Sequence, residues 1–101
     1  MHRITVEYWT PADPAAFDER YESGHVPLVR ALPGLLSFTL TRPRPLGGDA
    51  PHLVAEMWFA DGEAMKVALR SPQMAAAAED AAGLDVASTT MFAGEVDEAP
   101  R

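Results

Sequence analysis

The stretch HLVAEMWF, residues 52–59, shows most directly which fold this chain adopts. Its alternation predicts a β-strand, because successive side chains of a strand point to opposite faces of the sheet. One face would be wholly apolar and the other mixed: Leu53, Ala55, Met57 and Phe59 against His52, Val54, Glu56 and Trp58. A strand with two such faces belongs in a sheet that is covered differently on its two sides.

Three further segments predict strands. Residues 3–9 alternate and are rich in β-branched and aromatic side chains, residues 35–41 follow a Pro-Gly turn, and residues 87–96 are rich in Ser, Thr, Phe and Val. Proline and glycine residues at 43–48 predict the loop that follows the second strand. The chain therefore contains four expected strands.

Helices are expected between these strands. Apolar residues at helical spacing predict one long helix over residues 15–32. It contains Gly24 and Pro27, and we expect a kink there, because proline lacks an amide hydrogen and clashes with the preceding turn. A pair of shorter helices begins after Asp61 and Ser71, residue types that cap helix N-termini.

The order strand, helix, strand, strand, helix pair, strand predicts an α+β fold of the ferredoxin-like, split βαβ type. This fold has a four-stranded antiparallel sheet with its helices on one face. The other face has no helix left to cover it, yet it carries Trp58 and, depending on register, Tyr8 or Trp9. We therefore expect a homodimer in which two sheets form a dimeric α/β barrel. Residues 1–96 would form this domain and residues 97–101 a flexible tail.

The composition narrows the classes of partner. The 101 residues carry a formal net charge of −7, so neither nucleic acid nor an anionic membrane surface is an expected partner. The absence of cysteine excludes a disulfide scaffold, a thiol nucleophile and a thiolate metal site. No signal peptide or transmembrane segment is visible, which makes the cytoplasm the expected location.

Three segments together resemble the EthD family. They are YESGHVPL at residues 21–28 running on to LPGL at 32–35, HLVAEMWF at 52–59, and Ser-Pro with an alanine-rich helix at 71–80. The resemblance implies the same dimeric α/β barrel. It also implies binding of a small apolar or oxygenated metabolite, converted without a visible cofactor, in a catabolic or oxidative pathway.

His25 and Glu56 are the candidate catalytic residues, with His25 as acid or base and Glu56 as its partner. His25 lies at the edge of the helix's apolar stripe beside the expected kink, where a ring nitrogen can point into a pocket. Glu56 shares a strand face with Trp58, and burial there would raise the pKa of its carboxyl. In the alternative interpretation, His25 hydrogen-bonds an irregular turn and Glu56 pairs with an arginine at the barrel rim or across the dimer.

Aromatic side chains are the candidate ligand-binding residues, because flat aromatic walls suit apolar ligands. We expect Tyr8, Trp9, Phe38 and Trp58 to line the pocket, and Phe92 to lie in the core. Phe38 stands where the lactone isomerases of this barrel type are expected to carry a tyrosine. The corresponding hydroxyl is therefore missing from this chain.

Other kinds of site are not indicated. The histidines have no metal-ligand spacing, the serines no nucleophile-elbow context, and the Gly47-Gly48 pair precedes no helix as a phosphate loop would. We expect neither a metal nor a cofactor. Asp80, on the last helix, is expected to be a solvated or capping group.

Several functions stay open. The chain could be a cofactor-free oxidoreductase or its accessory protein, an isomerase or cyclase that transfers protons, or a non-catalytic ligand-binding or structural dimer. The pocket volume discriminates among them: a barrel interior well below about 300 Å³ would favour a core filled by side chains.

Overall fold

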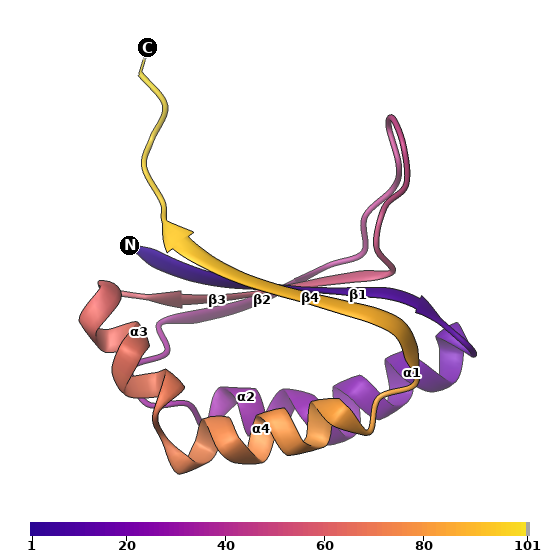
Figure 1. Cartoon of the computed structure of the whole chain (residues 1–101), viewed down its shortest axis with the longest axis horizontal. Helices are drawn as coiled ribbons and strands as arrows, with labels where there is room; N and C mark the ends of the chain where they lie inside the picture. Colours follow the sequence, from indigo (N-terminus) through magenta and orange to yellow (C-terminus); the bar gives the residue numbers. More distant parts are fainter. Residues whose placement is uncertain (101) are drawn as a thin grey trace.

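The computed structural model describes residues 1–100 and has one sheet with helices on one side (Figure 1). The strands are β1 (His2–Pro11), β2 (Ser37–Thr41), β3 (Leu53–Phe59) and β4 (Val86–Glu95). The helical elements are α1 (Pro14–Arg20), the π-helical turn η1 (Tyr21–His25), α2 (Val26–Arg30), α3 (Gly62–Leu69) and α4 (Pro72–Ala82).

The sheet is antiparallel throughout, in the order β2-β3-β1-β4. The two central strands, β3 and β1, are thus not neighbours in the sequence, because a helical segment and β2 separate them. This order, with every helix on one face, confirms the predicted ferredoxin-like split βαβ fold. The predicted strand boundaries lie within two residues of the observed ones, and the ends of β2 and β3 coincide with them.

The register decides which aromatic residue of β1 faces the helices. Arg3 lies opposite Trp58 and Thr5 opposite Glu56, so the odd-numbered residues of β1 share the face of Trp58. Trp9 therefore lies on the open face, and Tyr8 lies in the core on the helix side. The fully or nearly fully buried core residues of β1 and β3 are Ile4, Val6, Tyr8, Leu53, Ala55, Met57 and Phe59.

The expected distortion of the first helix is confirmed, and it takes the form of the wide turn η1. The Val26 N–H donates to the Tyr21 carbonyl, five residues back instead of four. Pro27 has no N–H to donate to the carbonyl four residues before it, so the regular ladder cannot continue through this segment. Gly34, at φ 74°, completes the turn after α2 in a conformation that favours glycine.

The other helices begin where capping residues predict. The Asp61 carboxylate accepts a hydrogen bond from the Ala64 N–H at 2.8 Å. The Ser71 hydroxyl accepts one from the Met74 N–H at 3.1 Å. These bonds satisfy N–H groups that have no partner inside the helix, so the local sequence alone sets where α3 and α4 start.

The open face of the sheet is mixed in character and only partly covered. Trp9 and Trp58 are half-buried there, and Phe92 is 47% exposed. The expectation that Phe92 lies in the core was wrong, because its place opposite Thr5 turns it to the side that has no helices.

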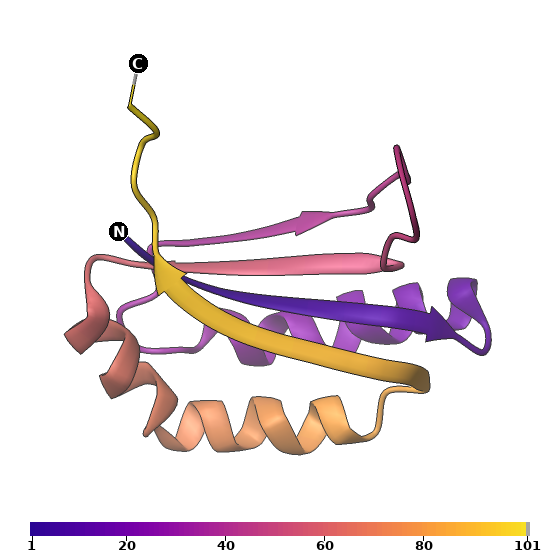
Figure 2. The ribbon, with the colours of Figure 1, turned by 45° about the horizontal axis from the view of Figure 1, so that its top comes forward.

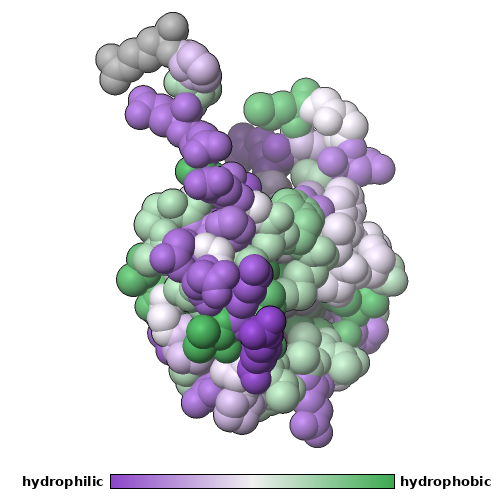
Figure 3. All heavy atoms as spheres, turned by 60° about the vertical axis from the view of Figure 1, so that its left-hand side comes forward, coloured by the Kyte–Doolittle hydropathy of each residue, from purple (hydrophilic) through white to green (hydrophobic). Residues whose placement is uncertain are grey.

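Two projections rise on the side of this open face. The loop between β2 and β3 and the chain after β4 both extend away from the helices, in two views (Figures 1 and 2). They also stand clear of the body of the molecule in the space-filling view (Figure 3). Residues 97–100 form no helix or strand, and Arg101, the end of the expected tail, lies outside the described residues. Within residues 1–100, no helix has the length and apolar character needed to cross a membrane.

Candidate functional site

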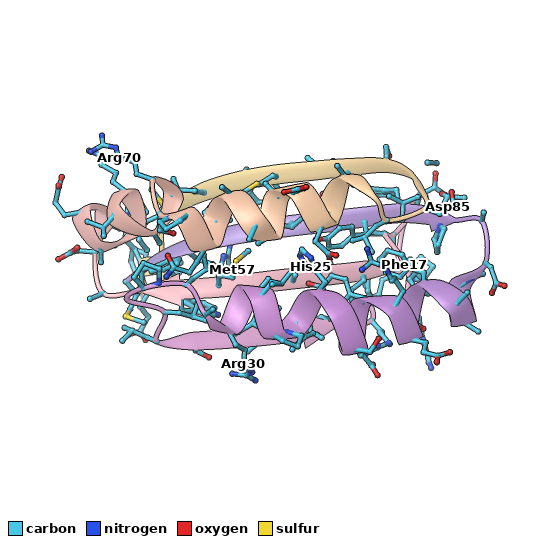
Figure 4. All side chains as sticks on the ribbon, turned by 90° about the horizontal axis from the view of Figure 1, so that it is seen from below. Phe17, His25, Arg30, Met57, Arg70 and Asp85 are labelled. Atoms are coloured by element: carbon cyan, nitrogen blue, oxygen red, sulfur yellow. The ribbon has the colours of Figure 1, made fainter. Side chains whose placement is uncertain are left out.

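A cavity of about 190 Å³ lies between the helix-covered face of the sheet and the helices. Its walls are mostly aliphatic, from Val6 and Met57 on the sheet, Val29 and Leu32 around α2, and Met74, Ala77 and Ala81 on α4. Viewed from the helix side, His25 and Met57 lie between the two long helical segments (Figure 4). The lining residues with polar side chains are Tyr8, Tyr21, His25 and Thr89, and of these the Tyr21 hydroxyl is itself fully buried.

His25 places an imidazole, which can accept or donate a proton, on the cavity wall. It is 4% exposed, and its Nδ1 lies 2.8 Å from Oδ2 of Asp80. Because an ionised carboxylate only accepts hydrogen bonds, Nδ1 carries the proton and donates it. The neutral ring then keeps a lone pair on Nε2, for which no partner is found among residues 1–100.

Asp80 is held in its charged form by Arg20. The guanidinium contacts both carboxylate oxygens, at 3.1 Å from Nη1 to Oδ2 and 2.9 Å from Nη2 to Oδ1. The hydrogen bond from Arg20 lowers the pKa of Asp80 most, His25 lowers it further, and burial opposes both. Asp80 was expected to be a solvated or capping group, which was wrong: it joins the cavity histidine to a surface arginine.

Gly24 leaves room for this arginine. A Cβ atom at Gly24 would lie 3.1 Å from Nη1 of Arg20, so the guanidinium would have to shift by a few tenths of an ångström. A Cβ atom at Gly83 would lie 3.6 Å from Nη2, which is an ordinary contact. Of the two glycines, Gly24 therefore bears more closely on the position of the arginine.

The turn η1 brings Tyr21 and His25 to the same inner face. Their ring centroids lie 5.0 Å apart, and the Tyr21 ring also meets Tyr8 edge-on at 5.3 Å. The Tyr21 hydroxyl is buried and has no hydrogen-bond partner among residues 1–100. A buried polar group without a partner is costly. The Tyr8 hydroxyl is the neighbouring polar group that acts on Tyr21.

Both tyrosines stay protonated over a wide pH range. Burial raises the pKa of Tyr8 to about 12; the nearby Tyr21 hydroxyl acts in the opposite direction, and the negative charge of Asp80 adds to the rise. Burial also raises the pKa of Tyr21, and Tyr8 raises it further. Each hydroxyl is therefore available as a hydrogen-bond donor.

Glu56 does not share the cavity with His25. It lies on the open face of β3, where its Oε2 is 3.1 Å from Nη1 of Arg3. The expectation that one cavity holds both residues was wrong for a single chain, because strand alternation turns Glu56 away from the helices that carry His25. Pairing of Glu56 with an arginine was the alternative interpretation, and the structure shows that pair.

The aromatic candidates are divided between the two faces. Tyr8 lines the cavity. Phe38 is buried on the helix side, outside the cavity wall, with the Arg30 guanidinium 5.8 Å from its ring. Trp9 and Trp58 lie on the open face, and ligand binding by them stays a prediction for a site that a second chain would have to complete.

A second histidine–carboxylate pair lies near the start of β3. Nε2 of His52 is 2.7 Å from Oδ1 of Asp18, and its ring packs edge-on against Phe17. The alternation of residues 52–59 had placed His52 on the face of Glu56, which was wrong because β3 begins only at Leu53. No cluster of metal-binding residues is found in the part of the chain that the structure describes.

This arrangement supports proton transfer at the cavity wall. Nε2 can accept a proton from a bound molecule, and the imidazolium that forms is stabilised by the Asp80 carboxylate. Asp80 was missed in the sequence because it is 55 residues from His25. Within the sequence, the one local indication of the Arg20–Asp80–His25 arrangement was that Arg20, Gly24 and His25 lie close together in one helical segment.

Comparison with known proteins agrees with the geometry. The model of the EthD domain matches residues 10–84. A curated relative from Rhodococcus erythropolis is 39% identical over 94 residues, covering 91% of both chains. It is described as an uncharacterized 11.0 kDa protein in the thcB-thcC intergenic region.

Solved structures show the same fold. An ethyl tert-butyl ether d (EthD) family protein from Bacillus halodurans C-125 is 33% identical, with a TM-score of 0.83 over 96% of this chain and 99% of that one. SnoaB from Streptomyces nogalater, a cofactor-independent oxygenase, is 18% identical, with a TM-score of 0.71 over 97% of this chain and 94% of that one. At that identity the likeness concerns the fold alone. The family model and the closely similar relatives together show that this chain belongs to the EthD family.

Proposed function

We propose that the protein binds a small, mostly apolar metabolite in the cavity between sheet and helices and transfers a proton on it through His25. The observation that carries this proposal is the buried His25 ring, fixed on Asp80 through Nδ1 with Nε2 unpaired. Such an arrangement is a general base with a set tautomer and a stabilised conjugate acid.

The size of the cavity limits the ligand. About 190 Å³ is below the roughly 300 Å³ at which pockets for drug-sized ligands begin, so volume alone favours a core filled by side chains. The buried polar groups on the wall argue for a ligand instead. An engineered apolar cavity of roughly 150 Å³ holds benzene, so this one fits a single ring with a few substituents.

We also propose that the protein acts as a homodimer through its open face. Trp9, Trp58 and Phe92 lie on this face, and the Thr5 hydroxyl is buried there without a partner among residues 1–100. The two projections beside it would flank a second sheet (Figure 2).

A cytoplasmic location and a place in a catabolic or oxidative pathway stay predictions. The names of the Bacillus and Streptomyces proteins support the predicted pathway.

Deuterium exchange tests the proton-transfer proposal. Nitroethane is a small neutral carbon acid, and proton NMR in deuterium oxide follows the loss of its acidic hydrogens. We expect the wild-type protein to accelerate exchange above buffer, and His25→Gln to lower that acceleration by about 10²- to 10⁴-fold, the usual effect of a general base. Ala81→Leu, which fills the cavity, should also slow exchange.

Two variants serve as controls. Ala75→Leu places the same bulk on the exposed side of α4, and Glu56→Gln removes the carboxylate of the open face. Neither should change the exchange rate. An unchanged rate in His25→Gln with a native circular dichroism spectrum, or no acceleration by the wild type, would overturn the proposal. A loss in Glu56→Gln would instead support the predicted role of that carboxylate.

A further inference from the structure

The cavity between sheet and helices is open along the edge of the sheet that β4 forms. Thr89 lies opposite Tyr8 and Met91 opposite Val6, so both side chains belong to the face that the helices cover. Both line the cavity, yet Thr89 is exposed and Met91 is 52% exposed. Side chains on this face are exposed only where no helix covers them, so the helix layer ends short of β4.

The opposite rim of this opening belongs to α4. Ala78 is exposed and Met74 is half-buried, and both line the same cavity. The sheet order makes β4 an edge strand, and α4 runs along the helix side of it (Figure 2). The entrance to the cavity therefore lies between β4 and α4, with Met91 on one rim and Met74 on the other.

His25 lies at the inner end of the cavity, away from this entrance. It is 4% exposed and lies between the two long helical segments, on the side of α4 away from β4 (Figure 4). The cavity wall includes residues of η1, α4 and β4, so the space extends from His25 past α4 to the edge of the sheet. A molecule that presents one end to His25 has its other end directed toward the entrance.

The rims of the entrance are apolar and adaptable. A methionine side chain is unbranched and has three rotatable bonds, so it fits itself to a variety of apolar shapes. Among residues 1–100, no lysine, arginine, aspartate or glutamate lines the cavity, so a charged chain would lose hydration there without gaining a partner. A hydrocarbon that covers the exposed part of Met91 removes apolar surface from water, which favours binding.

From these observations we infer that the ligand carries an unbranched hydrocarbon chain, which leaves the cavity between Met74 and Met91 while the reacting end lies at His25. This inference rests on the proposed function and names the substrate class. The volume of about 190 Å³ then limits only the reacting end, because the chain continues beyond the enclosed space. The two methionines determine specificity by the shape of the chain that they admit.

Alkylbenzenes test the inference through binding alone, without any reaction. We expect NMR titrations of the wild-type protein to show affinity rising from benzene through ethylbenzene to butylbenzene, by up to about fourfold for each methylene group. tert-Butylbenzene contains the same atoms as butylbenzene in a branched shape. It should bind about tenfold more weakly than butylbenzene, because the bulky group does not pass between the rims without strain.

A substitution on the rim makes the test specific. Met91→Gln keeps the length of the side chain and replaces its apolar end with an amide. It should leave the affinity for benzene unchanged and weaken the binding of butylbenzene by about tenfold, since the chain would then cover a polar group. The control is Val67→Gln, which introduces the same amide at a 61% exposed site on α3, outside the cavity wall. It should change neither affinity.

A nuclear Overhauser measurement locates the chain. The sequence has five methionines, and ¹³C labelling of their methyl groups reports on each of them. The terminal methyl group of bound butylbenzene should show contacts to the methyl groups of Met74 and Met91. Contacts to Met57 alone, which is 5% exposed, would show that the chain stays inside the cavity and would overturn the inference.

The outcomes separate this inference from the proposed function. If benzene binds and the longer chains bind no better, or if Met91→Gln binds butylbenzene as the wild type does, the chain inference is wrong. Loss of nitroethane exchange in His25→Gln would still support the proposed function in that case. If none of the alkylbenzenes binds, the cavity takes no apolar ligand, and both are overturned.

Discussion

The two faces of the sheet differ in what they do with polar residues. The helix-covered face is nearly all apolar, and its polar groups gather on one side of a cavity around His25. On the open face, polar residues lie among aromatic ones. The Arg3 guanidinium, for example, lies 5.5 Å from the centre of the Trp58 ring and also pairs with Glu56. The first face gathers its polar groups beside one cavity. The second has the mixed character of a protein interface.

This difference teaches that one strand can serve two separate purposes. Leu53 and Met57 of β3 complete the core and the cavity, whereas Glu56 and Trp58 point to the other side. Substitutions on one face should therefore change stability and ligand binding, and substitutions on the other should change association. Three predictions examine this separation.

The largest effect is expected in the core. Phe59 is fully buried, and Phe59→Ala should lower the free energy of unfolding by about 3–5 kcal/mol, through lost burial and the cavity it leaves. Val54→Ala, on the open face of the same strand, should cost much less within the isolated chain. Urea unfolding at low protein concentration measures both, and equal losses would show that the two faces are equally buried.

A smaller effect is expected for association. Trp58→Asp places a charge in the open face and should raise the dissociation constant of the homodimer by about 30-fold or more, the range of an interface hot spot. The control is Val67→Asp, which adds the same charge at an exposed site on α3. Sedimentation measures both, and a wild-type mass near the 10.9 kDa monomer at micromolar concentration would contradict the dimer.

The smallest effect is expected for the stability of the fold at alkaline pH. The pKa of Tyr8 is about 12 in the folded chain against 10.0 when unperturbed, so its contribution to stability is complete below pH 10 and is lost as pH rises toward 12. The chain has only two tyrosines, both in the cavity wall. Tyrosinate absorbance should therefore be absent from the native protein at pH 10, and a normal titration there would show that the wall is open to water.

Short-range features were predictable because their causes are local. The two faces of β3, residues 53–59, follow from alternation. The starts of α3 and α4 follow from capping side chains three residues away, and Pro27 acts on the turn just before it. His25 was identified for the same reason, since the helix stripe and the kink both lie within a few residues of it.

Long-range features were not predictable, and Asp80 is the main example. Its role depends on α4 packing beside η1, which places residues 55 positions apart at 2.8 Å. Glu56 and Trp9 were assigned to the pocket because the alternation defines two faces without saying which one meets the helices. A shift of one residue in the register would have exchanged them.

The sequence by itself determined the order of elements, the ferredoxin-like class, the family resemblance and the place of His25 beside the helix distortion, because each depends on spacing along the chain. Only the tertiary structure decided that the cavity lies on the helix side, that Asp80 and Arg20 fix the histidine, and that Tyr21 is left with an unpaired hydroxyl. The physical reason is that hydrogen bonding and burial of side chains depend on which distant segments pack together, and no local pattern encodes that choice.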